Sequence, residues 1–282
     1  MPQPVLLIGA GRAAHGGYPL ARIAAVRPVV LVDASAPGWA RPYLSGHLAA
    51  DPARESETAE AVARYAARHP VAGVLSWSRE HLAVTARITG RLGLPGLPYE
   101  TAAACADPAA ARALLVRHRV PQAKPDDPEG PLVSAETVVL DDEVRIAALT
   151  RTTSLRHSVH AHDGLLHNPF LRQTVERTVR ALGLTHTVAH VGLRLTERGP
   201  SVTGVAPHLP GELIPWLVER ATGVDLVGAA VALACGAVVE VTPTRQRAAA
   251  IRFAHASRRV SRMYWVVEGE DALECERALD AA

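Results

Sequence analysis

The sequence predicts an α/β protein with an N-terminal doubly wound parallel sheet and a C-terminal α+β lobe that contains an antiparallel sheet. Three observations lead to this prediction. Up to residue 120, short apolar runs alternate with helical patterns, which is typical of parallel sheets covered by helices. Residues 121–131 are rich in Pro, Asp and Gly and indicate a linker. Beyond the linker, strand-like segments joined by short turns predict antiparallel hairpins.

Apolar runs and their boundaries define the N-terminal elements. Val5–Ile8 is a short apolar run ended by Gly9 and Gly11, as expected for a buried parallel strand that turns into a helix. The same reasoning predicts two further strands, at Val29–Val32 and Val71–Leu75. Apolar residues at helical spacing predict helices at Leu20–Ala25, Ser56–His69, Glu80–Leu92 and Ala109–Arg117.

The C-terminal segments follow a different pattern. Two strands joined by an Asp-Asp turn are expected at Ala135–Leu140 and Glu143–Thr150. A second pair is expected at His186–Leu195 and Ser201–Ala206, joined by a turn at residues 197–200. The remaining predictions are helices at Asn168–Leu182, Leu213–Arg220 and Leu226–Ala234, and late strands at Arg247–His255 and Met263–Val267.

Composition and charge exclude several classes of function. Of the 282 residues, 30 are basic and 28 acidic, so the balance gives no electrostatic footprint for nucleic acid. No apolar run reaches the length of a membrane span, and we expect no membrane association. Three cysteines without metal-binding spacing are typical of a reduced, cytoplasmic compartment. Lys124 is the only lysine, so no mechanism can use two lysines of this chain.

Two predicted neighbouring strands carry the most informative motifs. The first contains His190 and Gly192 in A-H-V-G-L, and the second contains Gly204, Ala206 and His208 in T-G-V-A-P-H. The words L-P-G-E-L-I-P-W-L-V and A-T-G-V-D-L follow in order. This series resembles the C-terminal lobe of the ATP-grasp carboxylate ligases, in the branch of biotin-carboxylase-like and amino-acid ligases. That family has H-x-E on the first strand and E-x-N-x-R on the second.

The resemblance implies a degenerate ATP-grasp protein. The family's two Glu residues and its Asn hold magnesium against the nucleotide phosphates, and magnesium requires hard oxygen ligands. Gly192, Gly204 and Ala206 stand in their places and supply no side-chain oxygen. His208 replaces the family Arg. In the N-terminal part, Pro108 follows Asp107 where the family has a lysine.

The resemblance also implies a domain division. Residues 1–120 resemble the Rossmann-like pre-ATP-grasp domain, and residues 133–282 resemble the ATP-grasp C-terminal lobe. The family inserts a β-rich lid between these parts, whereas here residues 121–132 form a linker in its place. A small three-stranded sheet needs about five or six residues per strand plus turns, so the lid is expected to be missing.

Histidine and glutamate side chains are the candidate catalytic groups. On a strand, His160 and His162 would share one face, and His190 and His208 are expected on nearby strands of the same cleft. Glu212 matches the acidic position after L-x-G in the family. Such a set could perform acid–base chemistry or bind zinc or another divalent metal, although we assign no metal site.

Other residues are candidates for substrate binding. Gly9, Gly11 and Arg12 fit a G-x-G-x-x-A turn, with Asp33 after the next strand, which leaves NAD as an alternative ligand. We favour instead a tight turn that faces the cleft between the lobes. Arg12 and Arg194 could hold a carboxylate. The last candidates lie at the carboxyl end of a predicted parallel strand, where ligands bind in such sheets, and are Ser76 and Glu80.

Three functional hypotheses remain open. The first is an ATP-independent, repurposed enzyme of specialised metabolism that acts on a small carboxylate or amino-acid-like substrate by His and Glu acid–base chemistry. The second is a non-catalytic partner of a true ligase. The third is an ATP-dependent carboxylate–amine ligase completed by another subunit. The first two need no cofactor, and a homodimer is compatible with all three.

Overall fold

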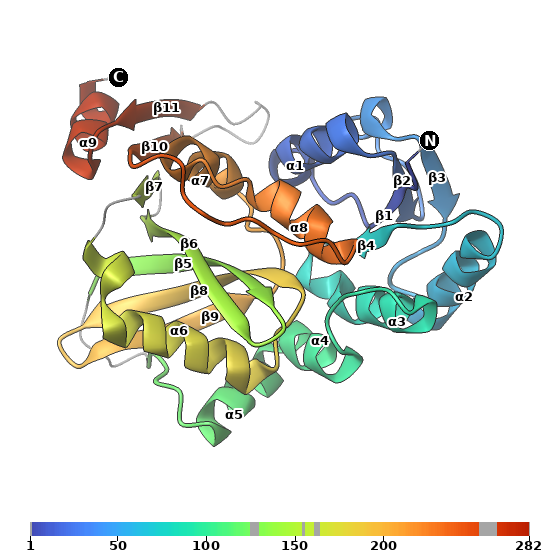
Figure 1. Ribbon diagram of the computed structural model, residues 1–282, viewed down its shortest axis with the longest axis horizontal. Coiled ribbons are helices and arrows are strands. Elements are labelled where there is room, and N and C mark those ends of the chain that lie inside the picture. Colours follow the sequence, from blue (N-terminus) through green and yellow to red (C-terminus); the bar gives the residue numbers. More distant parts are fainter. Residues whose placement is uncertain (1, 125–129, 154–155, 161–163, 254–263, 282) are drawn as a thin grey trace.

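The computed structural model describes residues 2–124, 130–153, 156–160, 164–253 and 264–281, which form two lobes, each built on one sheet (Figure 1). The N-terminal sheet is parallel, with the order β3-β2-β1-β4. Its strands are β1 (Val5–Ile8), β2 (Val29–Asp33), β3 (Gly46–Ala49) and β4 (Gly73–Leu75). The C-terminal sheet is antiparallel, with the order β11-β10-β7-β6-β5-β8-β9. The predicted fold class is therefore confirmed.

Helices cover both faces of the parallel sheet. They are α1 (Ala13–Val26) on one face and α2 (Glu55–Ala66) and α3 (Leu82–Leu92) on the other, whereas α4 (Tyr99–Ala106) and α5 (Pro108–Arg117) join a core with residues of the C-terminal sheet. Successive residues of β1 point to opposite faces. Val5 and Leu7 join an apolar core that includes residues of α1, whereas Leu6 and Ile8 join one that includes residues of α2 and α3. Burial on both faces explains why this strand is a continuous apolar run.

Three elements of this lobe differ from the prediction. Helix α1 begins at Ala13 instead of Leu20 and continues through Pro19, although glycine and proline weaken helices. Gly16 is required there, because an added Cβ would lie 2.9 Å from the rings of Trp39 and Trp77. Strand β3 and helix α4 were not predicted, and the 3-10 helix η2 (Arg79–His81) precedes α3. The short, half-exposed edge strand β3 lacks an apolar run.

The antiparallel sheet also has two helical layers. Its strands are β5 (Leu132–Leu140), β6 (Glu143–Thr152), β7 (Arg156–His160), β8 (Thr187–Thr196), β9 (Gly199–Ala206), β10 (Ala248–Phe253) and β11 (Tyr264–Gly269). Its helices are α6 (Pro169–Leu182), α7 (Ile214–Thr222), α8 (Leu226–Ala234) and the unpredicted α9 (Ala272–Ala281). Val139 and Val191 pack in the core that contains α6, whereas Val138 and Val188 pack in the core that contains α7 and α8. The face of the antiparallel sheet that carries Val138 and Val188 is therefore directed toward the N-terminal lobe.

The segment between α5 and β5 contains no helix or strand among its described residues, 118–124 and 130–131. Its first part lies along β9, where Val202 N–H donates to Pro121 O at 2.8 Å and Ala123 N–H donates to Val202 O at 2.9 Å. Asp107 caps α5 by accepting from Ala109 N–H at 2.8 Å, and Pro108 takes the first helical position. The Asp-Pro pair therefore serves as a helix start here.

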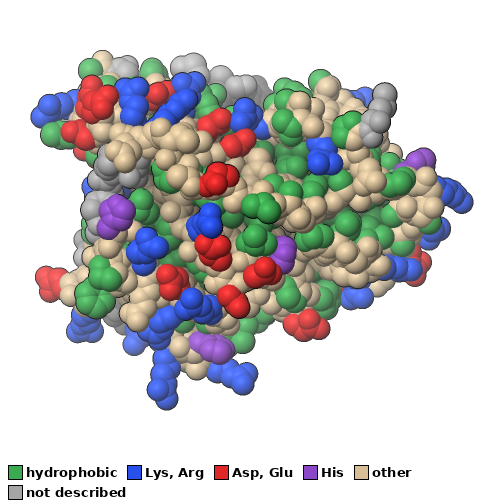
Figure 2. All heavy atoms as spheres, viewed as in Figure 1, with side chains coloured by type: hydrophobic (Ala, Val, Ile, Leu, Met, Phe, Trp, Pro, Cys, Tyr) green, Lys and Arg blue, Asp and Glu red, His purple; other side chains and the backbone are tan. Residues whose placement is uncertain are grey.

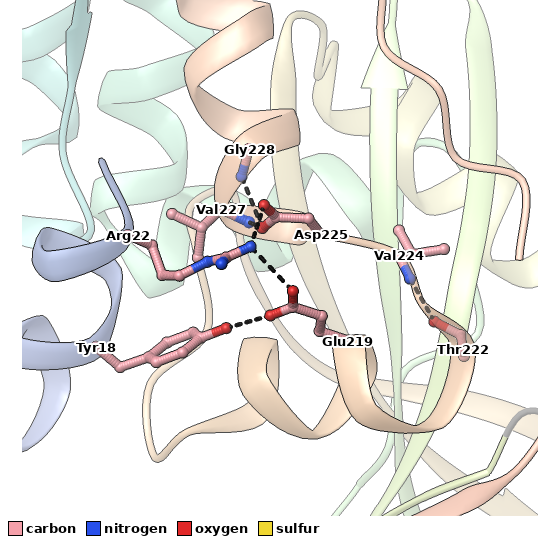
Figure 3. Close-up of polar contacts among 8 residues, drawn as sticks. All are labelled: Tyr18, Arg22, Glu219, Thr222, Val224, Asp225, Val227 and Gly228. Carbon is pink, nitrogen blue, oxygen red and sulfur yellow. Dashed lines mark hydrogen bonds and ion pairs between the residues drawn. The ribbon is translucent and has the colours of Figure 1, made fainter. Parts of the chain in front are cut away.

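A polar cluster and a continuous core join the lobes. Tyr18 Oη donates to Glu219 at 2.6 Å, and Arg22 contacts Glu219 at 2.9 Å and Asp225 at 2.8 Å (Figure 3). Asp225 also caps α8 by accepting from Val227 and Gly228 N–H. Beneath this cluster, apolar residues of α1, β1 and β2 share one core with those of α7 and α8. The two lobes are thus held in one fixed arrangement.

The surface is mixed in charge. On the face shown in Figure 2, basic and acidic side chains are interspersed, and basic side chains gather at the lower edge over α5 and α6. Among the described helices, none combines the length and the apolar character needed to cross a bilayer.

Candidate functional site

The centre of the candidate site is an ion pair between neighbouring strands. Glu136 of β5 lies opposite His190 of β8 in the antiparallel register. Their side chains meet, with His190 Nδ1 at 3.0 Å from Glu136 Oε2. Ser134 Oγ donates a second hydrogen bond to Glu136 Oε1 at 2.8 Å. Glu136 is completely buried, whereas 28% of the His190 side chain is exposed.

The two members of the pair stabilise each other's charge. Burial alone would raise the pKa of Glu136, but the positive charge of His190 and the hydrogen bonds from His190 and Ser134 outweigh it and hold that pKa below its ordinary value. Burial would lower the pKa of His190, and the Glu136 carboxylate raises it above its ordinary value. Because Nδ1 donates to Glu136, Nε2–H is the donor that His190 can offer to a ligand.

A second histidine lies nearby in the opposite protonation state. His208 Nδ1 is 2.9 Å from Leu209 O, and a carbonyl only accepts, so Nδ1 carries the proton. Burial lowers the pKa of His208, the hydrogen bond to Leu209 raises it in part, and the positive charges of Arg79 and His190 lower it further. The net shift is downward, so His208 is neutral and its Nε2 is an acceptor.

His208 also lines a narrow cavity of about 70 Å³ between the lobes. This volume holds a few water molecules, since one water needs about 10–15 Å³ on this measure. Ser76 lines it from the end of β4, and Thr85 Oγ1 is buried without a partner in the described part of the chain. Apolar side chains from both lobes form most of the wall and include Val74, Leu75, Leu82, Val188, Leu209 and Ala230.

The positions that correspond to the family's magnesium ligands meet in space. Gly192 is directly opposite Gly204 across β8 and β9, and Ala206 is opposite His190. None of these three residues has a side-chain oxygen. An added Cβ at Gly192 would lie 2.7 Å from Thr203 Oγ1, whereas one at Gly204 would meet nothing within 4 Å. These positions do not fit a magnesium–nucleotide complex as they stand.

The glycine turn after β1 is closed by the chain itself. Gly9 and Gly11 have φ values of +71° and +65°, which favour glycine. The His81 ring lies so close to Gly9 that an added Cβ would be 2.2 Å from it. Ala10 N–H, which a phosphate would need, donates to Asp33 Oδ2 at 3.0 Å. The acid expected to bind a ribose therefore holds the turn, and this geometry does not fit a dinucleotide.

The remaining predicted site residues are dispersed. Arg12 is exposed at the start of α1, and 76% of the Glu80 side chain is exposed. Arg194 follows Gly192 on the same face of β8, and its Nε is buried without a partner in the parts of the chain described here. Glu212 lies before α7 with an unusual positive φ of 56°.

The described residues do not bring the predicted histidine cluster together, because His160 lies away from His190. His160 ends β7, which β6 and β5 separate from β8, the strand of His190. His162 lies outside the described residues. Within the ranges that the structure describes, no group of three or more His, Cys, Asp or Glu residues could hold a metal ion. The described residues therefore give no support to the zinc alternative.

Sequence reasoning missed Glu136. It stands inside the expected strand Ala135–Leu140, where an acidic residue interrupts apolar positions. Charged residues in the middle of a buried strand are rare unless paired. That signal could have identified Glu136 as half of a pair, but only the strand register identifies His190 as the other half.

Comparisons with known proteins agree with this architecture. No protein-family model matches the chain. A curated relative, the uncharacterized protein y4rH of Sinorhizobium fredii (strain NBRC 101917 / NGR234), is 39% identical over 84 residues. That match covers 30% of this chain and only 18% of the relative's length.

Solved structures resemble the chain over its whole length. The L-amino acid ligase of Bacillus licheniformis has a TM-score of 0.82 and 15% identity, with coverage of 99% of this chain and 97% of that one. Phosphoribosylglycinamide synthetase of Anaerococcus prevotii has a TM-score of 0.80 and 14% identity, with coverage of 100% and 98%. Biotin carboxylase of Campylobacter jejuni, in a β-γ-ATP complex, has a TM-score of 0.72 and 10% identity, with coverage of 100% and 91%. The chain has the ATP-grasp fold.

Proposed function

We propose that this chain is an ATP-independent protein of the ATP-grasp fold that binds a small carboxylate or amino-acid-like substrate and acts on it by acid–base chemistry. The buried pair of Glu136 and His190 carries the proposal. Beside it, Gly192 and Gly204 leave no carboxylate to hold a divalent cation. The protonated imidazole of His190 lies beside two glycines that carry no charge. This arrangement suits an anionic organic group better than magnesium-bound phosphates.

Each polar residue has a distinct proposed role. His190 donates a hydrogen bond or a proton from Nε2, and Glu136 fixes the orientation and the charge of its ring. Arg194 lies on the same face of β8, and its Nε has no partner among the described residues. A guanidinium binds a carboxylate through two parallel hydrogen bonds. A substrate carboxylate at Arg194 would lie on the face of β8 that also carries His190.

Calorimetry with Mg-ATP and a thermal-shift panel of small carboxylates and amino acids test this proposal. We expect no saturable heat with Mg-ATP. A true carboxylate ligand at a hundredfold excess over its Kd should stabilise the protein by about 2.7 kcal/mol. Arg194→Gln and His190→Gln should remove that stabilisation, whereas the exposed control Arg198→Gln should retain it. Saturable, magnesium-dependent ATP binding would instead favour a ligase completed by another subunit.

Failure of every carboxylate to bind would favour a non-catalytic role. In that case His190→Gln and Arg194→Gln should behave like the control in every binding assay. Size-exclusion chromatography with light scattering, run on the same variants, would then report whether they change self-association. This outcome would also reject the acid–base proposal.

A further inference from the structure

We propose that His190 and His208 face one ligand with opposite hydrogen-bonding roles, His190 as the proton donor through Nε2–H and His208 as the proton acceptor through Nε2. The inference rests on the proposed function and specifies its substrate class. The ligand is a small molecule that carries an N–H or O–H group near an anionic or carbonyl oxygen. Such a ligand can donate a proton at one position and accept a proton at an adjacent position.

The hydrogen bonds at the two Nδ1 atoms assign the two roles. At His190, the carboxylate of Glu136 accepts from Nδ1–H and stabilises the doubly protonated ring. At His208, Leu209 O accepts from Nδ1–H and gives no compensation for a second proton. The Nδ1 atom of His190 therefore faces a negative charge, whereas the Nδ1 atom of His208 faces a neutral carbonyl. Environments that separate two titratable groups in this way identify an acid and a base.

The two histidines lie close together, one on β8 and the other just beyond the end of β9. His190 is in register with Ala206, and His208 follows two residues later along the chain. The positive charge of His190 acts on His208 strongly enough to contribute to its lowered pKa. His208 lines the cavity between the lobes, and 28% of the His190 side chain is exposed. The proposed ligand would extend from this cavity, whose lining does not include His190, to the exposed part of the His190 ring.

Arg79 is a positioning residue for this arrangement. Its Nη2 donates to Val205 O at 3.2 Å and so links η2 of the N-terminal lobe to β9. Its charge faces His208 from the N-terminal lobe, while the charge of His190 acts from β8. Both charges oppose protonation of His208. Burial is the main cause of the lowered pKa of His208, and Arg79 adds to it from the other lobe.

The proposed proton transfer is balanced without a co-reactant. The substrate X–H bond breaks and its proton moves to Nε2 of His208, while the Nε2–H bond of His190 breaks and its proton moves to a second substrate atom. The substrate is isomerised with its composition and charge unchanged. His208 ends protonated and His190 ends neutral, and exchange with water restores the starting state.

Ring-nitrogen NMR tests the assignment without any substrate. Long-range ¹H–¹⁵N spectra of the ¹⁵N-labelled protein between pH 5 and 9 distinguish neutral tautomers from imidazolium, and His190→Gln and His208→Gln assign the two rings. At pH 7 we expect His190 to be doubly protonated and His208 to be the neutral Nδ1–H tautomer. A charged His208, its Nε2–H tautomer, or a neutral His190 would overturn the proposal.

Two charge variants give an independent readout if a histidine variant fails to fold. Glu136→Gln should lower the pKa of His190, and Arg79→Gln should raise the pKa of His208. Arg64→Gln should change neither, since Arg64 lies on α2 with 69% of its side chain exposed. Unchanged titration of both histidines would reject the inference. These readouts are independent of Mg-ATP or carboxylate binding, so failure of the proposed function is recognised separately.

Discussion

Replacing Glu136 with glutamine should produce a loss of stability that depends on pH. Glutamine keeps the shape and one oxygen acceptor, which at the position of Oε1 can still accept from both His190 Nδ1–H and Ser134 Oγ–H. The bonds change from charge-assisted to neutral. Hydrogen bonds to charged groups contribute about 1.5–3 kcal/mol and neutral ones about 0.5–1.5 kcal/mol. We therefore expect Glu136→Gln to lower the free energy of unfolding by about 1–3 kcal/mol at pH 6.

The sign of the pH dependence follows from the two pKa shifts. The raised pKa of His190 contributes stability that is complete below about 6.5 and is lost as pH rises through the folded-state value. The lowered pKa of Glu136 contributes stability that is complete above about 4.3 and is lost as pH falls through the folded-state value. The pair therefore contributes most between these limits.

Urea unfolding monitored by circular dichroism at pH 6 and pH 9 measures this effect. At pH 9 a larger share of His190 is neutral, so the wild-type carboxylate is buried with less counter-charge and the cost of Glu136→Gln should shrink or reverse. Glu136→Ala should cost about 3–5 kcal/mol at pH 6, because it leaves the buried partners unpaired. Glu197→Gln is the exposed control. Equal losses for Glu136→Gln at both pH values would refute the ion-pair reasoning.

Three further substitutions, two of them with a matched control, test the packing by thermal unfolding. Gly9→Ala should destabilise by at least about 1–2 kcal/mol, since it combines a left-handed φ with an overlapping imidazole, whereas Gly17→Ala in α1 should be neutral or stabilise by up to about 1 kcal/mol. Gly192→Glu should destabilise the protein by about 1–3 kcal/mol, because its Cβ would overlap Thr203 of β9. Gly204→Glu points into open space and should change the free energy of unfolding by no more than about 0.5 kcal/mol. Tyr18→Phe should cost about 1–2 kcal/mol by removing the hydrogen bond to the α7 carboxylate. Equal effects of the paired glycine substitutions, or an unchanged Tm for Tyr18→Phe, would contradict these assignments.

Much of the fold was predictable because local signals agreed with tertiary packing. Apolar runs placed β1 and β2, and the turn residues placed the β5–β6 and β8–β9 hairpins. The start of α1 was not predictable, since Gly16 and Pro19 disfavour a helix locally and the two indole rings packed against Gly16 come from distant segments. Strand β3 pairs only with β2 at the sheet edge, so it carries no strong apolar pattern.

The site was predictable only in part. Motif order singled out His190 and His208 and placed Gly192 and Gly204 on neighbouring strands, whereas the direct pairing of the two glycines comes from the sheet register. The partner of His190 was not predictable, because a cross-strand contact between residues 54 positions apart leaves no trace in local spacing. His160 was grouped with His190 because both were expected on nearby strands of one cleft, but the sheet order places two strands between theirs.

The core that joins the lobes has a consequence for how the protein is assembled. One face of the parallel sheet, through α1, is covered by α7 and α8, which follow it in sequence by nearly two hundred residues. Neither half of the chain can bury its share of this joint core alone. Packing of the first half can therefore be completed only after α8 has been synthesised, and a break in the linker should yield halves that remain bound to each other.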